Sequence, residues 1–295
     1  GDYKSCSCSH LVHMISALLK HRTQEDDLIN LIGLKGDWAI EPATDFVSDY
    51  VRPFFDDVKG SFQGLLEKKQ GEPTLFEVKQ REKTTLLNQI AEAVFALGGG
   101  GFQYFYNDRD ETLKNADQAF LSYQLLERAI GEKTPVFRDR SDFLERMEDG
   151  RALKIWRFFQ EDWKKTEDRF RNCFWFRTLR ETDIYLFWGN GVSLMPMVGS
   201  VALYQLPLKG GKERILIMIN HLEENGLHFS LRSTGGKFSC GDLAYRFVQK
   251  MLEKIPEPSQ ITGGGHPFAA EVRTRRANAD PAFVLETFFS ILKEN

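Results

Sequence analysis

The stretch Ile261-Thr-Gly-Gly-Gly-His-Pro-Phe-Ala-Ala270 places three consecutive glycines directly before a histidine. Glycine permits positive φ and lets a ligand approach the backbone without a Cβ in the way. Successive N–H groups in such a turn can form a concave anion site, with the histidine donating to a phosphate oxygen at its lip. The sequence therefore predicts a phosphate-binding turn made by Gly263, Gly264, Gly265 and His266. The alternative is a plain flexible loop with an exposed histidine.

The segments around this stretch alternate between strand-like and helix-like patterns. Apolar or alternating runs predict strands at 184–188, 214–219, 227–233 and 268–273. Helical spacing predicts helices at 197–206, 243–254 and 281–293, the second opened by a capping box at Ser239 and Asp242. Upstream, helix patterns dominate from residue 43 to about 180. We therefore expect an α/β protein, with a helix-rich N-terminal region followed by a C-terminal α/β domain that contains a small mixed sheet.

An arginine ends the predicted strand at 227–233. Arg232 belongs to the residue type best suited to bidentate phosphate contact. The order of features is then a strand ending in Ser-x-Arg-Ser, a capped helix and Gly-Gly-Gly-His-Pro-x-Ala-Ala. This order resembles the DHH-associated C-terminal domain of the RecJ and nanoRNase branch of DHH phosphoesterases.

The resemblance implies a role for each matching residue. Arg232, Gly263, Gly264, Gly265 and His266 would bind the phosphate end or the backbone of the substrate, with Ala269 and Ala270 as structural support. The family usually has glycine after the alanine pair, whereas this chain has Glu271. A carboxylate that pointed inward at this position would repel phosphate.

The catalytic metal motifs of the family are mostly absent from the sequence. DHH phosphoesterases carry metal ions, usually manganese (Mn²⁺), on His-x-Asp-x-Asp, Asp-His-His and further aspartates. Neither of those two motifs occurs here. Residues 5–20 resemble the helix that follows the triplet, and Ile32-Gly-Leu-Lys-Gly-Asp37 resembles a later metal-binding segment. Asp37 would then be a metal ligand; otherwise it is an ordinary turn aspartate, and alone it cannot hold a two-metal centre.

The resemblance predicts three regions. Residues 1–60 would be the C-terminal remnant of a DHH-type catalytic domain, 61–180 a helical connector or insertion, and 181–295 the DHH-associated phosphate- and nucleic-acid-binding domain. Within the second region, Trp156, Phe159, Trp163, Phe170 and Phe174 fall near helical spacing. That spacing favours a core stripe; the alternative is a stacking surface for single strands among the neighbouring basic residues.

The composition of the chain limits which ligands and which compartment we expect. The net charge is −3 and the pI about 6.1, which favours a short or small anionic substrate, or a local basic patch, over long nucleic acid. Four cysteines do not make a disulfide framework in a chain of 295 residues. With no signal-peptide pattern and no membrane span, we expect a cytoplasmic protein.

Three functions follow as hypotheses. The first is a metal-dependent phosphodiesterase or exonuclease on single-stranded or short oligonucleotides, of which this chain carries mainly the substrate-binding lobe. The second is a non-catalytic module that binds nucleic acid or nucleotides or serves as a scaffold. The third is a phosphoesterase for a small dinucleotide or for polyphosphate.

Overall fold

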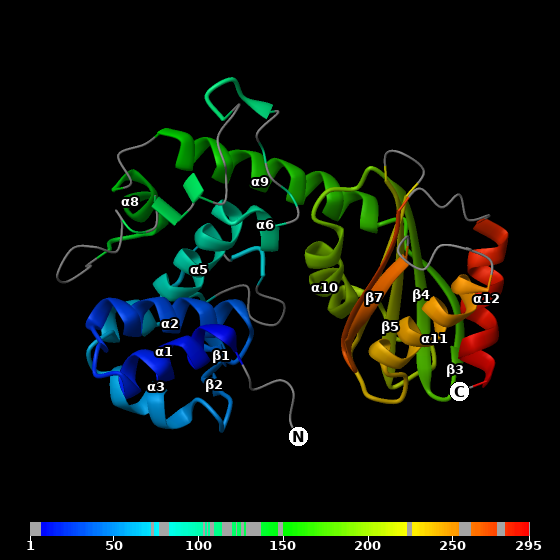
Figure 1. The fold of residues 1–295 in the computed structure, drawn as a ribbon, viewed down its shortest axis with the longest axis horizontal. Coiled ribbons are helices and arrows are strands. Elements are labelled where there is room, and N and C mark those ends of the chain that lie inside the picture. Colours follow the sequence, from blue (N-terminus) through cyan, green and yellow to red (C-terminus); the bar gives the residue numbers. More distant parts are fainter. Residues whose placement is uncertain are drawn as a thin grey trace. The chain divides into compact units, whose positions relative to one another are not determined.

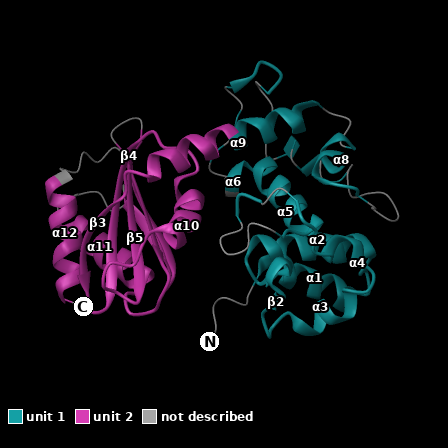
Figure 2. Cartoon of the chain, turned by 180° about the vertical axis from the view of Figure 1, so that it is seen from behind, with its two compact units in different colours: residues 1–160 teal, residues 161–295 magenta. Residues whose placement is uncertain are grey.

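The computed structural model divides the chain into two compact units, residues 1–160 and 161–295 (Figure 2). The described residues are 7–71, 74–76, 83–102, 104, 106, 109–113, 120, 121, 123, 124, 127, 137–146, 150–222, 226–253, 261–275 and 281–294. None of the helices within these ranges has the length and apolar character needed to span a membrane.

The first unit is mainly helical (Figure 1). Its elements are α1 (Cys8–Leu18), α2 (Gln24–Gly36), β1 (Ile40–Glu41), β2 (Phe46–Val47), α3 (Arg52–Val58), α4 (Gln63–Leu66), α5 (Leu86–Leu97), α6 (Gly99–Phe102) and α8 (Arg140–Glu145), with a short 3₁₀ helix at Pro42–Thr44. Helix α9 (Gly150–Phe170) begins in this unit and ends in the second.

Helix α2 begins at a capping box. The Thr23 hydroxyl accepts from the Asp26 N–H, and the Asp26 carboxylate accepts from the Thr23 N–H. The fully buried Leu28, Leu31 and Leu34 then face the core between α2 and α5. Asp37 is the C-cap residue of this helix.

Helix α1 packs with its polar face inward. The buried residues are His10 and His13, which are 6% and 7% exposed. The Nε2 of His13 lies 2.7 Å from a carboxylate oxygen of Asp27 on α2, and the rings of both histidines contact Phe54. The apolar face is exposed instead, and Leu18 keeps 80% of its surface accessible. The large exposed side chains of this helix and its end are Leu11, Val12, Met14, Ile15, Leu18 and Leu19.

The second unit is built on a six-stranded mixed sheet. Its strands are β3 (Phe174–Leu179), β4 (Thr182–Asn190), β5 (Glu213–His221), β6 (Leu227–Ser233), β7 (Ile261–His266) and β8 (Ala269–Thr274), in the order β3-β4-β5-β6-β8-β7. Only the β4–β5 pair within this described sheet is parallel. The expected α/β fold class, a helix-rich region followed by a mixed-sheet domain, is therefore confirmed.

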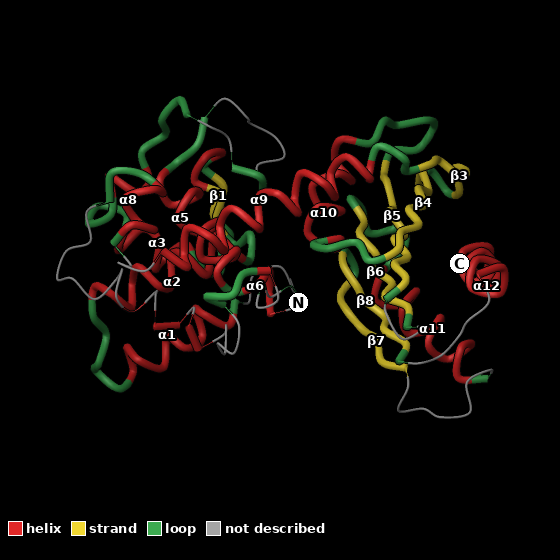
Figure 3. The backbone as a smooth tube through the Cα atoms, turned by 90° about the horizontal axis from the view of Figure 1, so that it is seen from above, coloured by secondary structure: helices red, strands yellow, loops and turns green. Residues whose placement is uncertain are grey.

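Helices cover both faces of this sheet. Helix α10 (Met195–Gln205) packs on β5 and β6, whereas α11 (Cys240–Leu252) packs on β6, β7 and β8, with α12 (Pro281–Glu294) beside it (Figure 3). On the α11 side, the rings of Phe247 and Phe288 stack at a centroid distance of 4.1 Å, and the Phe229 ring lies tilted against both at 4.8 and 5.8 Å. Ser239 caps α11 as predicted, because its hydroxyl accepts from the Asp242 N–H.

The predicted C-terminal domain, residues 181–295, lies within the second unit, which also includes β3 and the end of α9. The aromatic stripe of α9 is core as predicted, since Trp156, Phe159, Trp163 and Phe170 are buried. Phe174 is different: it opens β3 and is half exposed. The assignments of 1–60 as a catalytic-domain remnant and of 61–180 as a connector stay predictions.

Candidate functional site

The three glycines form a strand and not a turn. Gly263, Gly264 and Gly265 lie in β7 and pair with Val272, Glu271 and Ala270 of β8. The hairpin turn is made by Pro267 and Phe268, directly after His266. The predicted glycine turn with a concave amide site is therefore wrong. β7 is an edge strand of the described sheet, so one side of its backbone has no neighbouring strand there.

Two of the glycines are required by packing. A Cβ at Gly263 would lie 2.7 Å from Cγ2 of Val272, and one at Gly265 would lie 2.4 Å from the carbonyl oxygen of Ala269. A Cβ at Gly241, in the first turn of α11, would lie 2.8 Å from the carbonyl oxygen of Gly265. The backbones of α11, β7 and β8 thus approach one another too closely for side chains here.

Gly264 is open. No heavy atom lies within 4 Å of the position its Cβ would take. Since side chains alternate along a strand, Gly264 faces the side of the sheet opposite to Gly263 and Gly265. Of the three predicted glycines, this one leaves room for a ligand.

Polar residues share the face of Gly264. On β6, His228, Ser230 and Arg232 alternate toward this side, and Ser230 pairs directly with Glu271 of β8. We call His228, Ser230, Arg232 and Glu271 the polar stripe. Across the strands β6, β8 and β7 the registers form three rows: Arg232–Ala269–His266, Ser230–Glu271–Gly264 and His228–Arg273–Thr262.

Arg232 is held by four neighbours. Its Nε donates to Oγ of Ser200 on α10 at 2.9 Å, and Nη1 donates to the Leu231 carbonyl at 2.9 Å and more weakly to that of Ala270 at 3.4 Å. Its Nη2 lies 3.3 Å from Oε1 of Glu271. The Arg232 side chain is 14% exposed, and these bonds fix its guanidinium in position beside α10.

Glu271 points inward, toward Arg232 and His228. Its Oε2 lies 3.1 Å from Nε2 of His228, which is 1% exposed. Burial opposes ionisation of Glu271, but the hydrogen bond and charge of His228, together with Arg232, lower its pKa to about 2. The carboxylate is therefore ionised at neutral pH and neutralises part of the Arg232 charge.

His266 is exposed at the end of β7, in the same row as Arg232. The Phe268 N–H approaches its Nδ1 at 3.4 Å. When Nδ1 accepts this bond, the proton of the neutral ring is on Nε2. The structure thus brings Arg232, Gly264 and His266 to one face and turns Gly263 and Gly265 toward α11.

Asp37 lies in the other unit, exposed at the end of α2. Among the described residues, no group of three or more His, Cys, Asp or Glu side chains has the arrangement of a metal site. The described part of the chain therefore does not fit the ligand set of a two-metal manganese centre. The role of Asp37 as a metal ligand stays a prediction.

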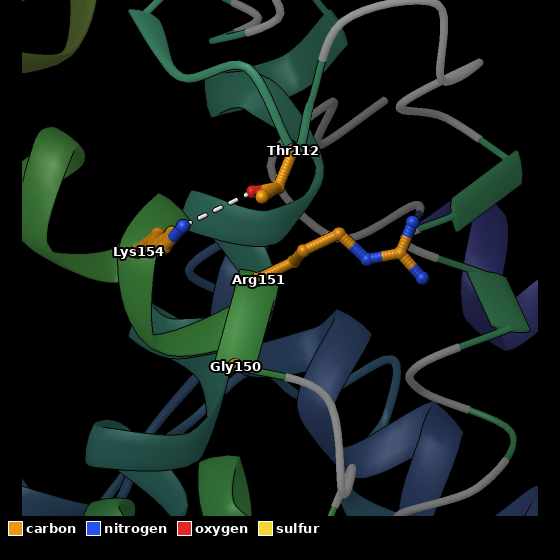
Figure 4. A pocket seen from close by; sticks show the side chains of 4 residues that line it. All are labelled: Thr112, Gly150, Arg151 and Lys154. Atoms are coloured by element: carbon orange, nitrogen blue, oxygen red, sulfur yellow. Dashed lines mark hydrogen bonds between the residues drawn. The ribbon is translucent and has the colours of Figure 1, made fainter.

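A cavity of about 450 Å³ lies in the first unit, lined by Thr112, Gly150, Arg151 and Lys154 (Figure 4). Nζ of Lys154 is bonded to Thr112 Oγ1 and to Asp110, each at 3.1 Å. The guanidinium of Arg151 points away from Lys154 (Figure 4). The two cations do not converge, so the polar stripe remains the better candidate site.

Sequence reasoning missed three residues of this site: His228, Ser200 and Ser230. The signal for two of them is the alternation His228-x-Ser230-x-Arg232, which places them on the face of the predicted arginine. Ser200 gave no signal, because its contact with Arg232 joins positions 32 residues apart.

Comparison with known proteins finds matches among solved structures. No family model matches the chain, and no curated protein matches it. A solved structure described as the DHH domain of a member of the S1p family of ribosomal proteins matches with a TM-score of 0.49 and 12% identity. The match covers 91% of this chain and 50% of that one, so the chain spans about half the length of the structure it resembles.

Proposed function

We propose that the polar stripe and the open strand at Gly264 bind a phosphodiester of a single-stranded or short oligonucleotide. The observation that carries this proposal is the row Arg232–Ala269–His266, which presents two cationic or donor side chains on the face where Gly264 leaves open space. Guanidinium and imidazole are donors suited to phosphate oxygens. Ala269, which lies between them in the row, has only a methyl side chain.

The wider proposal is that this chain is mainly the substrate-binding lobe of a DHH-family metal-dependent phosphodiesterase or exonuclease. The motif order from Arg232 to His266 supports it. The manganese ions of such an enzyme would need ligands beyond the described residues, so no hydrolytic step is assigned to this chain. Degradation assays with manganese on dinucleotides, single strands of increasing length and polyphosphate separate the three candidate functions.

The binding proposal is tested with a double variant, Arg232→Ala with His266→Ala. Fluorescence anisotropy of a labelled short single strand at fixed salt is expected to show binding weakened by about 30- to 100-fold, since two phosphate contacts are lost. The slope of log K against log salt is expected to fall by about 1.

The matched control is Arg246→Ala with His21→Ala, which removes the same two residue types from α11 and from an exposed position in the first unit. It is expected to bind as the unaltered protein does. Thermal unfolding checks that both double variants are folded, and Arg232→Lys, which keeps the charge but not the fork, provides a milder second variant. Unchanged affinity in the Arg232/His266 variant would overturn the proposal.

A further inference from the structure

Glu271 occupies the centre of the polar stripe, between buried Ser230 of β6 and open Gly264 of β7. Its two oxygens bond Arg232 at 3.3 Å and His228 at 3.1 Å. A carboxylate offers about four acceptor positions, so these bonds leave acceptor capacity for a ligand. The side chain is 30% exposed, and a ligand at Gly264 therefore meets it directly.

The carboxylate opposes ligands that carry only negative charge. It contacts the Arg232 guanidinium, so a phosphate on that guanidinium comes close to Glu271 as well. Like charges at short range repel substantially even at an effective dielectric constant of about 20. The best match for this face is an anion that carries a hydrogen-bond donor beside it.

Ser230 gives the row a hydroxyl that the described residues leave without a hydrogen bond. Its side chain is fully buried, and its Oγ has no hydrogen-bond partner among the described residues. Buried hydroxyls normally have a partner. The row Ser230–Glu271–Gly264 thus combines an unsatisfied hydroxyl, a carboxylate with free acceptor positions and open space.

A sugar hydroxyl fits this row better than a base does. In RNA, the 2′-hydroxyl is attached to the carbon next to the one that carries the 3′-phosphate, and it can donate a hydrogen bond. Donors on the bases differ from base to base and lie farther from the phosphate. The absence of a Cβ at Gly264 leaves room for a ribose directly opposite the carboxylate.

We propose that Glu271 is a specificity-determining residue: its carboxylate accepts a hydrogen bond from the 2′-hydroxyl beside a phosphate bound at Arg232, and so favours RNA over DNA strands. This inference rests on the proposed phosphodiester-binding function. It also implies that polyphosphate, which has charge and no donor, binds this face poorly.

The experiment compares three short strands of one sequence at fixed salt: ribo, deoxyribo and 2′-O-methyl. The unaltered protein is expected to bind the ribo strand about five- to tenfold more tightly than the deoxyribo strand. The 2′-O-methyl strand, which keeps the oxygen but lacks the donor hydrogen, is expected to bind no better than the deoxyribo strand.

Two variants of Glu271 sharpen the test. Glu271→Gly frees Arg232 and removes the acceptor, so we expect the deoxyribo strand to bind several-fold more tightly and the ribo preference to fall to within about twofold. Glu271→Gln keeps an acceptor oxygen without the charge, so both strands are expected to bind more tightly with part of the preference retained. Glu286→Gln, at an exposed position of α12, is the control.

The outcomes separate the two proposals. If the strands bind with dependence on Arg232 and His266 but with equal affinity for ribo and deoxyribo, only the role of Glu271 is overturned. A ribo preference that survives in Glu271→Gly overturns it as well. If no strand binds the unaltered protein, the proposed function fails together with it. The 2′-O-methyl comparison uses the unaltered protein, so a 2′-O-methyl strand that binds as tightly as the ribo strand overturns the donor role of the 2′-hydroxyl even if a variant does not fold.

Discussion

Asp183 organises a loop of the second unit from a fully buried position. Its carboxylate accepts from the Thr178 hydroxyl at 2.5 Å and from the backbone N–H groups of Lys209, Gly210 and Gly211 at 2.7–3.3 Å. Gly211 is needed there, because a Cβ would lie 2.7 Å from the Asp183 nitrogen. Each of these bonds compensates part of the free energy of burying the charge.

Asp183→Asn is expected to lower the free energy of unfolding by about 2–4 kcal/mol, because an amide NH₂ replaces an acceptor facing N–H donors. Burial opposes ionisation, but the bonds from Thr178 and the loop hold the pKa of Asp183 below its ordinary 3.8. The native state therefore gains stability from this group above the ordinary pKa and loses it as the pH falls.

Denaturant titrations of the unaltered protein and of Asp183→Asn at about pH 7 and about pH 3 measure this effect. The difference between their free energies of unfolding is expected to be smaller at the lower pH. Asp168→Asn, at a half-exposed carboxylate of α9 paired with Arg171, is the control and is expected to change stability little. A variant as stable as the unaltered protein at pH 7 would contradict the account.

For single residues, the sequence indicates a phosphate contact for Arg232 but not which side chains hold Arg232 in place. Its place at the end of an alternating strand and its fork of donors indicated a phosphate contact from sequence alone. His228 has no partner nearby in sequence, and its contact with Glu271 joins positions 43 residues apart across β6 and β8. The charge of Glu271 was visible in the sequence, but its use in fixing Arg232 depends on that strand pairing.

Among the elements, β7 shows why the glycines were misinterpreted. Strand prediction depends on alternating side chains, and a run of three glycines has none to alternate. The close approach of α11 and β8 then decides the outcome, since only glycine fits at positions 263 and 265. The neighbouring β6 and β8 carry ordinary alternation and were predicted within one residue of their bounds.

Helix α1 has a clear apolar face in its sequence, yet that face is exposed in the structure. Leu18→Ser is expected to change the free energy of unfolding by less than about 0.5 kcal/mol, because the exposed leucine buries little apolar surface in the folded protein. His13→Ala removes the contact with Asp27 and the ring contact with Phe54, so it is expected to destabilise by about 1–2 kcal/mol.

Chemical denaturation of Leu18→Ser and His13→Ala measures the free energy of unfolding of each variant. Leu28→Ala on α2, at a fully buried leucine, provides the reference for a core position and is expected to lose about 2–5 kcal/mol. A comparable loss in Leu18→Ser would show that something covers the apolar face of α1 in the folded protein.

For the molecule as a whole, fold class was predictable and the border between the units was not. The change from helical spacing to strand patterns near residue 182 marks β4, but the sheet already begins with β3 at Phe174, within the stretch where helix patterns dominate in the sequence. The compact second unit nevertheless begins at residue 161, inside α9. A helix with one continuous aromatic stripe does not show in its sequence which of two cores each aromatic joins.

The last turns of α9 have a consequence for how the chain can be divided. Thr166 donates to the Ser193 carbonyl at 2.7 Å, Arg169 donates to the Asn190 carbonyl at 3.1 Å, and Phe170 stacks on Phe187 at 4.3 Å. A fragment of residues 150–295 is therefore expected to fold with a cooperative melt. A fragment cut at the first strand, 174–295, would leave Phe187 uncovered and is expected to melt at least about 10 °C lower.

Circular dichroism melts of the two fragments measure this, and equal melting temperatures would contradict it. The border between the two units lies inside α9, so a protease finds no loop to cut there. For the same reason, a recombination event at this border would have to keep α9 intact. The minimal folding unit of this part of the chain is then the sheet together with the C-terminal end of α9.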